Sequence, residues 1–342
     1  MAYTNRQWRL ASRPVGMIQE SNFELVTEEI PEVPEGHFLV RNLFLAFEPA
    51  MRGWVDDVPS YIPPVGLGEV MRASTVGQIV ESRHPDYPKG KIVSGMLGWQ
   101  EYFLTDGTPG LLGGVSMVPD GIPPHRMLSL LGGTGLTAYF GINYVHPVQE
   151  GDQVLVSGAA GATGSVVSQI ARIRGAGKVV GIAGGPEKCA WLKEKAGLDA
   201  AIDYKNEDVG KRIREEFPDG VDLYFDNVGG DILNETLLRM KDFGRITMCG
   251  GISGYNDAEP APGPSNIMQI VIKRLSVKGF ILIDHLAKAG EAIADLSTWA
   301  AEGKLVVEED IQEGFENTPK TFLRLFQGKN LGKQLLKIAD AE

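Results

Sequence analysis

The strongest candidate for chemistry in this chain is a glycine-rich segment, Ser157–Ser165 (SGAAGATGS). It follows an apolar run, Gln153–Ser157 (QVLVS), and precedes a helical pattern over Ser165–Arg174. The amide groups and positive dipole end of such a helix start can bind the pyrophosphate of a dinucleotide. The segment lacks the full GxGxxG spacing, although Gly161 and Gly164 allow a close approach of the backbone to a ligand. Alone it could be an ordinary turn, but the strand–helix units that follow favour a dinucleotide site.

The end of the next strand indicates which dinucleotide is bound. An NAD site usually has an acid there, which holds the ribose 2′-hydroxyl. This chain has Ala183–Lys188 (AGGPEK), in which small residues leave room for a 2′-phosphate and Lys188 offers a cation. Tyr204 could add a hydroxyl donor, whereas Glu187 is a counter-signal. Lys188 and Tyr204 could each be ordinary surface residues, but together with the missing acid they favour NADPH over NADH.

The side chains that could bind zinc are scattered. A structural zinc site needs clustered cysteines and histidines. The two cysteines, Cys189 and Cys249, lie far apart in the sequence, and Cys249 is expected near the cofactor without a catalytic role. The five histidines show no paired spacing either: His37, His84, His125, His146 and His285. The sequence therefore predicts no metal site.

Alternating strands and helices are expected to position the dinucleotide site. After Gln153–Ser157, strands are expected at Lys178–Ala183, Ala200–Asp203, Val221–Asp226, Arg245–Cys249 and Ser276–Leu282. Helices are expected to begin at Pro186 and Asp231, to end near Phe217, and to cover Asn266–Arg274. Six parallel strands wound in this way form the doubly wound α/β sheet of the Rossmann fold.

The earlier part of the chain has a different pattern. Short apolar runs such as His37–Ala46 and Ala73–Ser82 alternate with Pro and Gly, which is typical of a mostly β domain. After the helices, a strand-like run and the turn Gly328–Lys333 (GKNLGK) suggest that the chain returns to this first domain. We therefore expect two domains: a substrate domain formed by 1–127 and 301–342, and a dinucleotide domain formed by 128–300.

The composition excludes several classes of partner. A formal net charge of −11 argues against nucleic acid and against an anionic membrane surface. No stretch approaches the roughly 20 apolar residues of a membrane span, and the start of the chain lacks an apolar signal core. Two cysteines cannot form a disulfide framework. A cytoplasmic location without nucleic-acid or membrane partners is expected from these features.

Several motifs spread over the chain resemble one family. They are Arg9–Pro14 (RLASRP), Gly135–Gly141 (GLTAYFG), the glycine-rich segment, Val179–Lys188 (VVGIAGGPEK), Phe225–Gly230 (FDNVGG), Cys249–Asn256 (CGGISGYN) and Gly328–Lys333. Together they resemble the zinc-free branch of the medium-chain dehydrogenase/reductases that holds leukotriene B4 dehydrogenase/prostaglandin reductases and plant double-bond reductases. Pro59–Pro64 (PSYIPP) and His84–Tyr87 (HPDY) are most similar to bacterial curcumin reductases.

The resemblance implies a fold and an activity. The first domain would have a chaperonin-10-like β fold, and the enzyme would use NADPH to reduce the carbon–carbon double bond of an enone or enal. The resemblance also implies these cofactor contacts: Ala162, Thr163, Gly164, Ser165, Lys188, Tyr204, Asn227, Cys249, Ile252, Ser253, Phe280, Ile281, Leu282 and Asn330. One departure concerns Glu48–Arg52 (EPAMR), where relatives commonly have Asp-Pro-Tyr-Met-Arg. Ala50 stands where some relatives have a substrate-facing tyrosine, which puts the identity of the substrate in doubt.

A zinc-free reaction of this kind needs a hydrogen-bond donor at the substrate carbonyl. Tyr255 lies just beyond the fifth strand, at the edge where doubly wound sheets bind ligands, and is the candidate catalytic and substrate-binding residue. Tyr255 could instead be a lid residue that merely packs on the substrate. Tyr61, in the PSYIPP turn, is a weaker second candidate for the donor and is expected to bind substrate. Two other functions stay open: a zinc-free carbonyl or quinone reductase, and an NADPH-binding module without turnover. A homodimer is also expected, because Ser276–Leu282 should form an apolar sheet edge.

Overall fold

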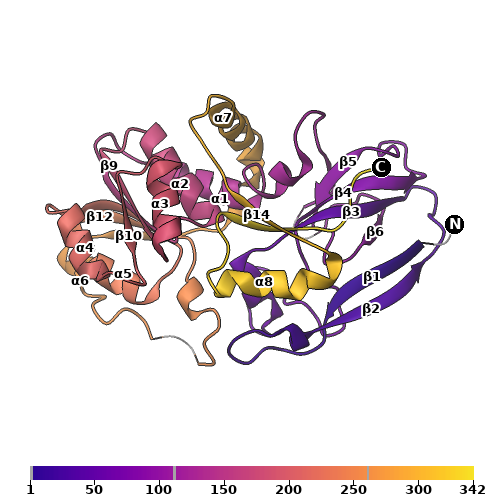
Figure 1. Cartoon of the computed structure of the whole chain (residues 1–342), viewed down its shortest axis with the longest axis horizontal. Coiled ribbons are helices and arrows are strands. Elements are labelled where there is room, and N and C mark those ends of the chain that lie inside the picture. The colour runs from indigo at the N-terminus through magenta and orange to yellow at the C-terminus, as the bar shows by residue number, and fades with distance from the viewer. Residues whose placement is uncertain (1–2, 111–112, 260–261) are drawn as a thin grey trace. The chain divides into compact units, whose positions relative to one another are not determined.

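The computed structural model describes residues 3–110, 113–259 and 262–342, and it divides into two compact units (Figure 1). Unit 1 consists of Met1–Ser129 and Glu309–Glu342, and unit 2 consists of Leu130–Glu308. The second expected boundary, after residue 300, thus differs by several residues. The segment that follows helix α7 (Ala289–Ala301) belongs to unit 2, where Gln169 contacts it. The Gln169 side chain donates to the carbonyl of Val306 and accepts from its amide, both at 2.8 Å.

Unit 2 contains a six-stranded parallel sheet. Its strands are β8 (Gln153–Ser157), β9 (Lys178–Ala183), β10 (Ala200–Asp203), β11 (Val221–Asp226), β12 (Met240–Met248) and β13 (Ser276–Gly279). The order β10-β9-β8-β11-β12-β13, with every pair parallel, is the doubly wound order of dinucleotide-binding folds. The predicted Rossmann sheet is therefore confirmed.

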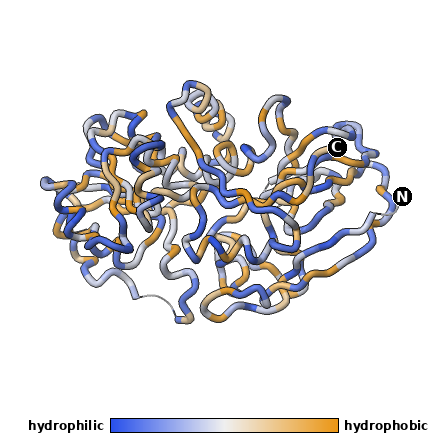
Figure 2. Tube along the Cα trace, viewed as in Figure 1, coloured by the Kyte–Doolittle hydropathy of each residue, from blue (hydrophilic) through white to orange (hydrophobic). Residues whose placement is uncertain are grey.

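Helices cover this sheet and close its core. They are α1 (Gly133–Phe140), α2 (Ala162–Ile173), α3 (Pro186–Glu194), α4 (Val209–Glu216), α5 (Gly230–Leu237), α6 (Gln269–Ile272) and α7. The strands supply fully buried apolar side chains such as Leu155, Val180 and Ile246. Figure 2 shows the same strands in the colours of hydrophobic residues. None of the helices in the described ranges combines the length and apolarity needed to cross a membrane.

Two strands and one helix of unit 2 differ most from their expected bounds. β12 begins at Met240 rather than Arg245, because a bulge in its pairing with β11 admits Phe243 at a positive φ of 62°. β13 ends at Gly279, and a 3₁₀ helix over Leu282–Lys288 replaces the end of the expected strand. Helix α6 covers only the middle of Asn266–Arg274.

Unit 1 is rich in β-structure, as the sequence predicts. Its strands are β1 (Tyr3–Leu10), β2 (Phe23–Ile30), β3 (Phe38–Ala46), β4 (Thr75–Ser82), β5 (Ile92–Gly95), β6 (Tyr102–Thr105), β7 (Ser116–Met117), β14 (Glu309–Glu313) and β15 (Lys333–Lys337). β15 pairs with β3 and β14 pairs with β15, which confirms that the C-terminal segment returns to this unit. Helix α8 (Thr318–Phe326) contributes Phe322, which packs against Trp99 and Phe47 in the core.

Candidate active site

The glycine-rich loop of unit 2 joins β8 directly to the start of α2. Gly158 has a positive φ of 58°, and Gly161 is the residue that precedes the helix. A Cβ built on Gly164 would lie 2.4 Å from the carbonyl oxygen of Gly158, so only glycine lets the first turn of α2 pack against the loop. Ala162 and Thr163 at the start of the helix are partly exposed, whereas Gly164 and Ser165 are buried. The amide of Ser165 already donates to the Gly161 carbonyl at 3.0 Å, so the amides of Ala162, Thr163 and Gly164 are the ones in the first turn that are placed to bind a pyrophosphate.

A buried carboxylate connects this loop to the next strand end. Asp226 is fully buried, and its Oδ1 accepts from the Ser157 hydroxyl at 2.8 Å, from the Tyr224 hydroxyl at 2.7 Å and from two backbone amides of the following turn. Burial, together with the Asp226 charge, raises the pKa of Tyr224 well above its usual value. The Asn227 side chain donates to the carbonyl of Ser157 at 2.7 Å. Asn227, an expected cofactor contact, is thus held beside the glycine-rich loop.

The segment after β12 lies on the same edge of the sheet. The amide of Cys249 donates to the Asp226 carbonyl at 2.8 Å, and the amide of Ile252 donates to the Asn227 carbonyl at 3.3 Å. The Ser253 hydroxyl donates to the carbonyl of the residue after Asn227 at 2.6 Å. Burial, and secondarily the Asp226 charge, raises the pKa of the Cys249 thiol to about 12. Cys249 is therefore a thiol rather than a nucleophilic thiolate at neutral pH.

Tyr255 belongs to this segment and folds back onto it. Its phenolic oxygen accepts a hydrogen bond from the amide of Gly251 at 3.1 Å, and the side chain is half-buried. The structure thus places Tyr255 with Cys249, Ile252 and Ser253 at the carboxyl edge of the parallel sheet. That edge is where such sheets bind ligands.

The strand tip predicted to select the dinucleotide carries the expected residues. Tyr204 follows β10, and its amide donates to the carbonyl of Ala183 at 3.1 Å. Its ring lies against Gly184, and Lys188 lies in the first turn of α3. Lys205, which sequence reasoning did not single out, also reaches Gly184. No local spacing signals Lys205, because its position depends on the pairing of β10 with β9.

The other expected cofactor contacts lie apart from this group in the sequence. Phe280, Ile281 and Leu282 follow β13, and the Phe280 ring packs edge-on against Phe225 with centroids 6.4 Å apart. Asn330 belongs to unit 1, where its side-chain amide donates to the carbonyl of Gly332 at 3.0 Å.

Tyr61 lies in unit 1 and has a defined hydroxyl partner. Its oxygen accepts a hydrogen bond from the indole nitrogen of Trp54 at 2.9 Å. Since an indole N–H can only donate, the Tyr61 proton is left for another acceptor. Burial, with a smaller effect of the Glu48 charge, raises the pKa of Tyr61 despite the opposing Trp54 hydrogen bond. Tyr61 is 46% exposed, so a ligand can reach it.

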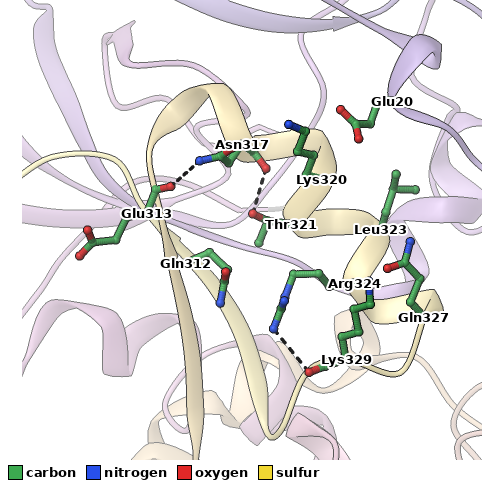
Figure 3. A pocket seen from close by; sticks show the side chains of 10 residues that line it. All are labelled: Glu20, Gln312, Glu313, Asn317, Lys320, Thr321, Leu323, Arg324, Gln327 and Lys329. Carbon is green, nitrogen blue, oxygen red and sulfur yellow. Dashed lines mark hydrogen bonds between the residues drawn. The ribbon is translucent and has the colours of Figure 1, made fainter.

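A separate polar groove of 440 Å³ lies on unit 1 (Figure 3). Figure 3 shows side chains of α8 and its neighbours around it: Glu20, Gln312, Glu313, Asn317, Lys320, Thr321, Leu323, Arg324, Gln327 and Lys329. The Arg324 guanidinium already donates to Asp310 at 2.7 Å and to Gln334 at 2.9 Å. The groove contains none of the expected site residues.

Two family models match the chain. The N-terminal domain of oxidoreductase matches residues 6–111, and zinc-binding dehydrogenase matches residues 162–298. Despite the name of the second model, residues 3–110, 113–259 and 262–342 contain no group of three His, Cys, Asp or Glu side chains that could hold a metal. Within these ranges the donor set does not offer the clustered ligands of a zinc site.

Known proteins resemble the chain over nearly its full length. The NADPH-dependent curcumin reductase of Escherichia coli (strain K12) is 37% identical, over 98% of this chain and 97% of the relative. Prostaglandin reductase 1 of Bos taurus is 40% identical, over 97% and 98%. The crystal structure of CurA in complex with NADPH from Vibrio vulnificus matches with a TM-score of 0.91 and 38% identity, over 98% of this chain and 99% of that one. The chain therefore belongs to the medium-chain dehydrogenase/reductase family, in the branch of the curcumin and prostaglandin reductases.

Proposed function

We propose that this protein uses NADPH to reduce the carbon–carbon double bond of α,β-unsaturated ketones and aldehydes. The proposal rests on the edge of the sheet that binds dinucleotides, where the tip of β9 has glycine in place of the acid of an NAD site. The chain is also similar to curcumin and prostaglandin reductases. The missing acid favours NADPH, since a carboxylate there would repel a 2′-phosphate.

The residues at this edge fit the parts of the cofactor. The α2 start, from Ala162 to Ser165, would hold the pyrophosphate, and Lys188 with Tyr204 would hold the 2′-phosphate. Further contacts are proposed from Asn227, Cys249, Ile252, Ser253, Phe280, Ile281, Leu282 and Asn330. When bound, NADPH supplies a hydride to the substrate.

The chain itself must stabilise the negative charge that develops on the substrate carbonyl oxygen. We assign this hydrogen bond to Tyr255, with Tyr61 as a substrate-binding residue. A protonated phenol can donate throughout the reaction, so a Lewis-acid metal is not required. Zinc independence, a cytoplasmic location and a homodimer remain predictions of this proposal.

Product identification tests the proposal. The purified protein should oxidise NADPH in the presence of 4-phenyl-3-buten-2-one, and chromatography should identify the saturated ketone. The rate should be the same with EDTA, and elemental analysis should find no stoichiometric zinc. An allylic alcohol as product would indicate a carbonyl reductase. If no NADPH is oxidised with any of a panel of enones, enals and quinones, the protein would be an NADPH-binding module without turnover.

A further inference from the structure

The tip of β9 in unit 2 is occupied by side chains that follow a different strand, β10. In an NAD-binding sheet, a carboxylate at the strand tip holds the ribose 2′-hydroxyl. Here a Cβ built on Gly184 would lie 2.8 Å from Cε1 of Tyr204 and 2.9 Å from Cε of Lys205. Real Cβ atoms do not approach other heavy atoms this closely, so a side chain at Gly184 would have to displace Tyr204 and Lys205. A phenol and the end of a lysine thus fill the space that a longer side chain would use.

Strand pairing brings these residues together. β10 runs parallel to β9 with Asp203 opposite Ala183, so the residues that follow Asp203 lie beside Gly184. Tyr204 and Lys205 are both exposed to solvent. Within the part of the chain that the structure describes, the Lys205 ammonium group makes no hydrogen bond or ion pair, while its backbone amide donates to Asp203 at 3.1 Å. Lys205 therefore presents an ammonium group at the strand tip that has no hydrogen-bond partner within the described residues, although it lies in the field of the Asp203 carboxylate.

Asp203, the acidic residue before Tyr204, already accepts hydrogen bonds from the backbone. Asp203 accepts from the amide of Gly185 at 2.7 Å and from the Asn206 side chain at 2.7 Å, in addition to Lys205. Burial acts to raise the pKa of Asp203, but these hydrogen bonds and the Lys205 charge lower it overall. The side chain of Glu207 accepts from the amide of Asp203 at 2.7 Å. Both carboxylates thus fix the turn that carries Lys205.

We propose that Lys205 binds the 2′-phosphate of NADPH and is a residue that determines the preference for NADPH over NADH. The inference rests on the proposed cofactor and adds a second cation to Lys188 and the Tyr204 hydroxyl. An ammonium group forms strong, charge-assisted hydrogen bonds with phosphate. The packing of the Lys205 stem on Gly184 restricts the side chain before the ligand arrives, which lowers the entropic cost of binding. NADH lacks the phosphate and gains nothing from this lysine.

Calorimetric binding of NADP⁺ and NAD⁺ to the full chain, without substrate, tests the inference. Lys205→Met keeps the length of the stem and removes the charge, so NADP⁺ should bind about 5- to 30-fold more weakly, with less than about a twofold change for NAD⁺. The loss should shrink at high salt, because an exposed charge pair is screened. Lys205→Arg should retain most of the affinity. Lys211→Met on α4, whose side chain is 70% exposed, removes the same charge elsewhere on unit 2 and should change neither affinity.

The outcomes separate this inference from the proposed function. Unchanged NADP⁺ affinity in Lys205→Met, or equal losses for NADP⁺ and NAD⁺, would overturn the role of Lys205 and leave the proposed reaction intact. Failure of the unmodified protein to bind NADP⁺ would overturn the proposed function itself. Thermal unfolding of each variant should match that of the unmodified protein, since Lys205 is exposed.

Discussion

At the scale of single residues, Tyr61 and Tyr255 differ in what their hydroxyl groups contact. The oxygen of Tyr255 accepts from a backbone amide in its own loop, and the oxygen of Tyr61 accepts from the indole of Trp54. Because backbone and indole N–H groups can only donate, both phenol oxygens act as acceptors in these contacts. Tyr61 belongs to unit 1, whereas Tyr255 belongs to unit 2, which contains the dinucleotide-binding sheet. This placement is why we assign the proton donor to Tyr255.

Removal of each hydroxyl should therefore have a different kinetic effect. Tyr255→Phe should lower kcat at least about tenfold, because positioned acid catalysis typically contributes about 10²–10⁴-fold, and the KM for NADPH should barely move. Tyr61→Phe should mainly raise the KM for the enone, and Trp54→Phe should reproduce that effect by removing the hydrogen bond that orients Tyr61. Steady-state kinetics with both substrates varied provides the measurement. Nearly full turnover in Tyr255→Phe would leave Tyr255 with a packing role only.

At the scale of elements, hydrophobic runs predicted the unit 2 sheet well because parallel strands are buried on both faces. β8, β9, β10 and β11 have the expected bounds, and the loop before α2 lies where its glycines indicate. β12 was predicted too short, since its bulged beginning is polar and contains a glycine. The sequence alone could not predict which side chains come into contact when the strands pair.

Two such contacts matter for the site. Lys205 meets Gly184 only because β10 pairs with β9, and the Asp226 carboxylate reaches Ser157 only because β11 pairs with β8. Local spacing could identify glycines that allow a close approach. It could not show which side chains after a neighbouring strand would take up the space.

His146 joins two strands at the edge of the sheet and makes stability dependent on pH. Its ring lies 3.2 Å from the Thr247 hydroxyl on β12 and 3.0 Å from the Ser276 hydroxyl on β13, and it is only 4% exposed. Burial, with the nearby charges of Lys278 and Arg245, lowers the pKa of His146 to about 4. The unfolded chain takes up a proton near pH 6.5, whereas the folded chain does so only near pH 4. Stability should therefore be lost as the pH falls between these values, by about 3 kcal/mol at most.

Urea unfolding at a series of pH values tests this expectation. His146→Gln retains a hydrogen-bonding side chain without a titration, so its free energy of unfolding should fall less steeply than that of the unmodified protein between pH 6.5 and 4. His37→Gln, which replaces a histidine near the surface of unit 1, should leave the slope unchanged. Equal slopes for His146→Gln and the unmodified protein would assign the acid sensitivity to other groups.

At the scale of the whole molecule, the outer edge of the unit 2 sheet is the feature that bears on assembly. β13 is the last strand in the sheet order, and Val277 within it is 39% exposed. Nearby, Ile281, Ile283 and Leu286 are 36%, 37% and 40% exposed. An unpaired strand edge beside exposed apolar side chains such as these favours association with another strand. Pairing with the same edge of a second copy would satisfy both edges and close the assembly by two-fold symmetry.

We therefore predict a homodimer that a charge on this edge disrupts. Light scattering at micromolar concentration should give twice the mass of the 37.0 kDa chain. Val277→Glu should shift the mass toward one chain, because each copy would place a carboxylate opposite its mate in a desolvated contact. Val58→Glu is the matched control: Val58 is a 55% exposed valine of unit 1, away from β13 in the chain, and its replacement should leave the dimer intact. A monomeric mass for the unmodified protein would exclude the dimer, and dissociation by both variants alike would show that the contact lies elsewhere than at β13.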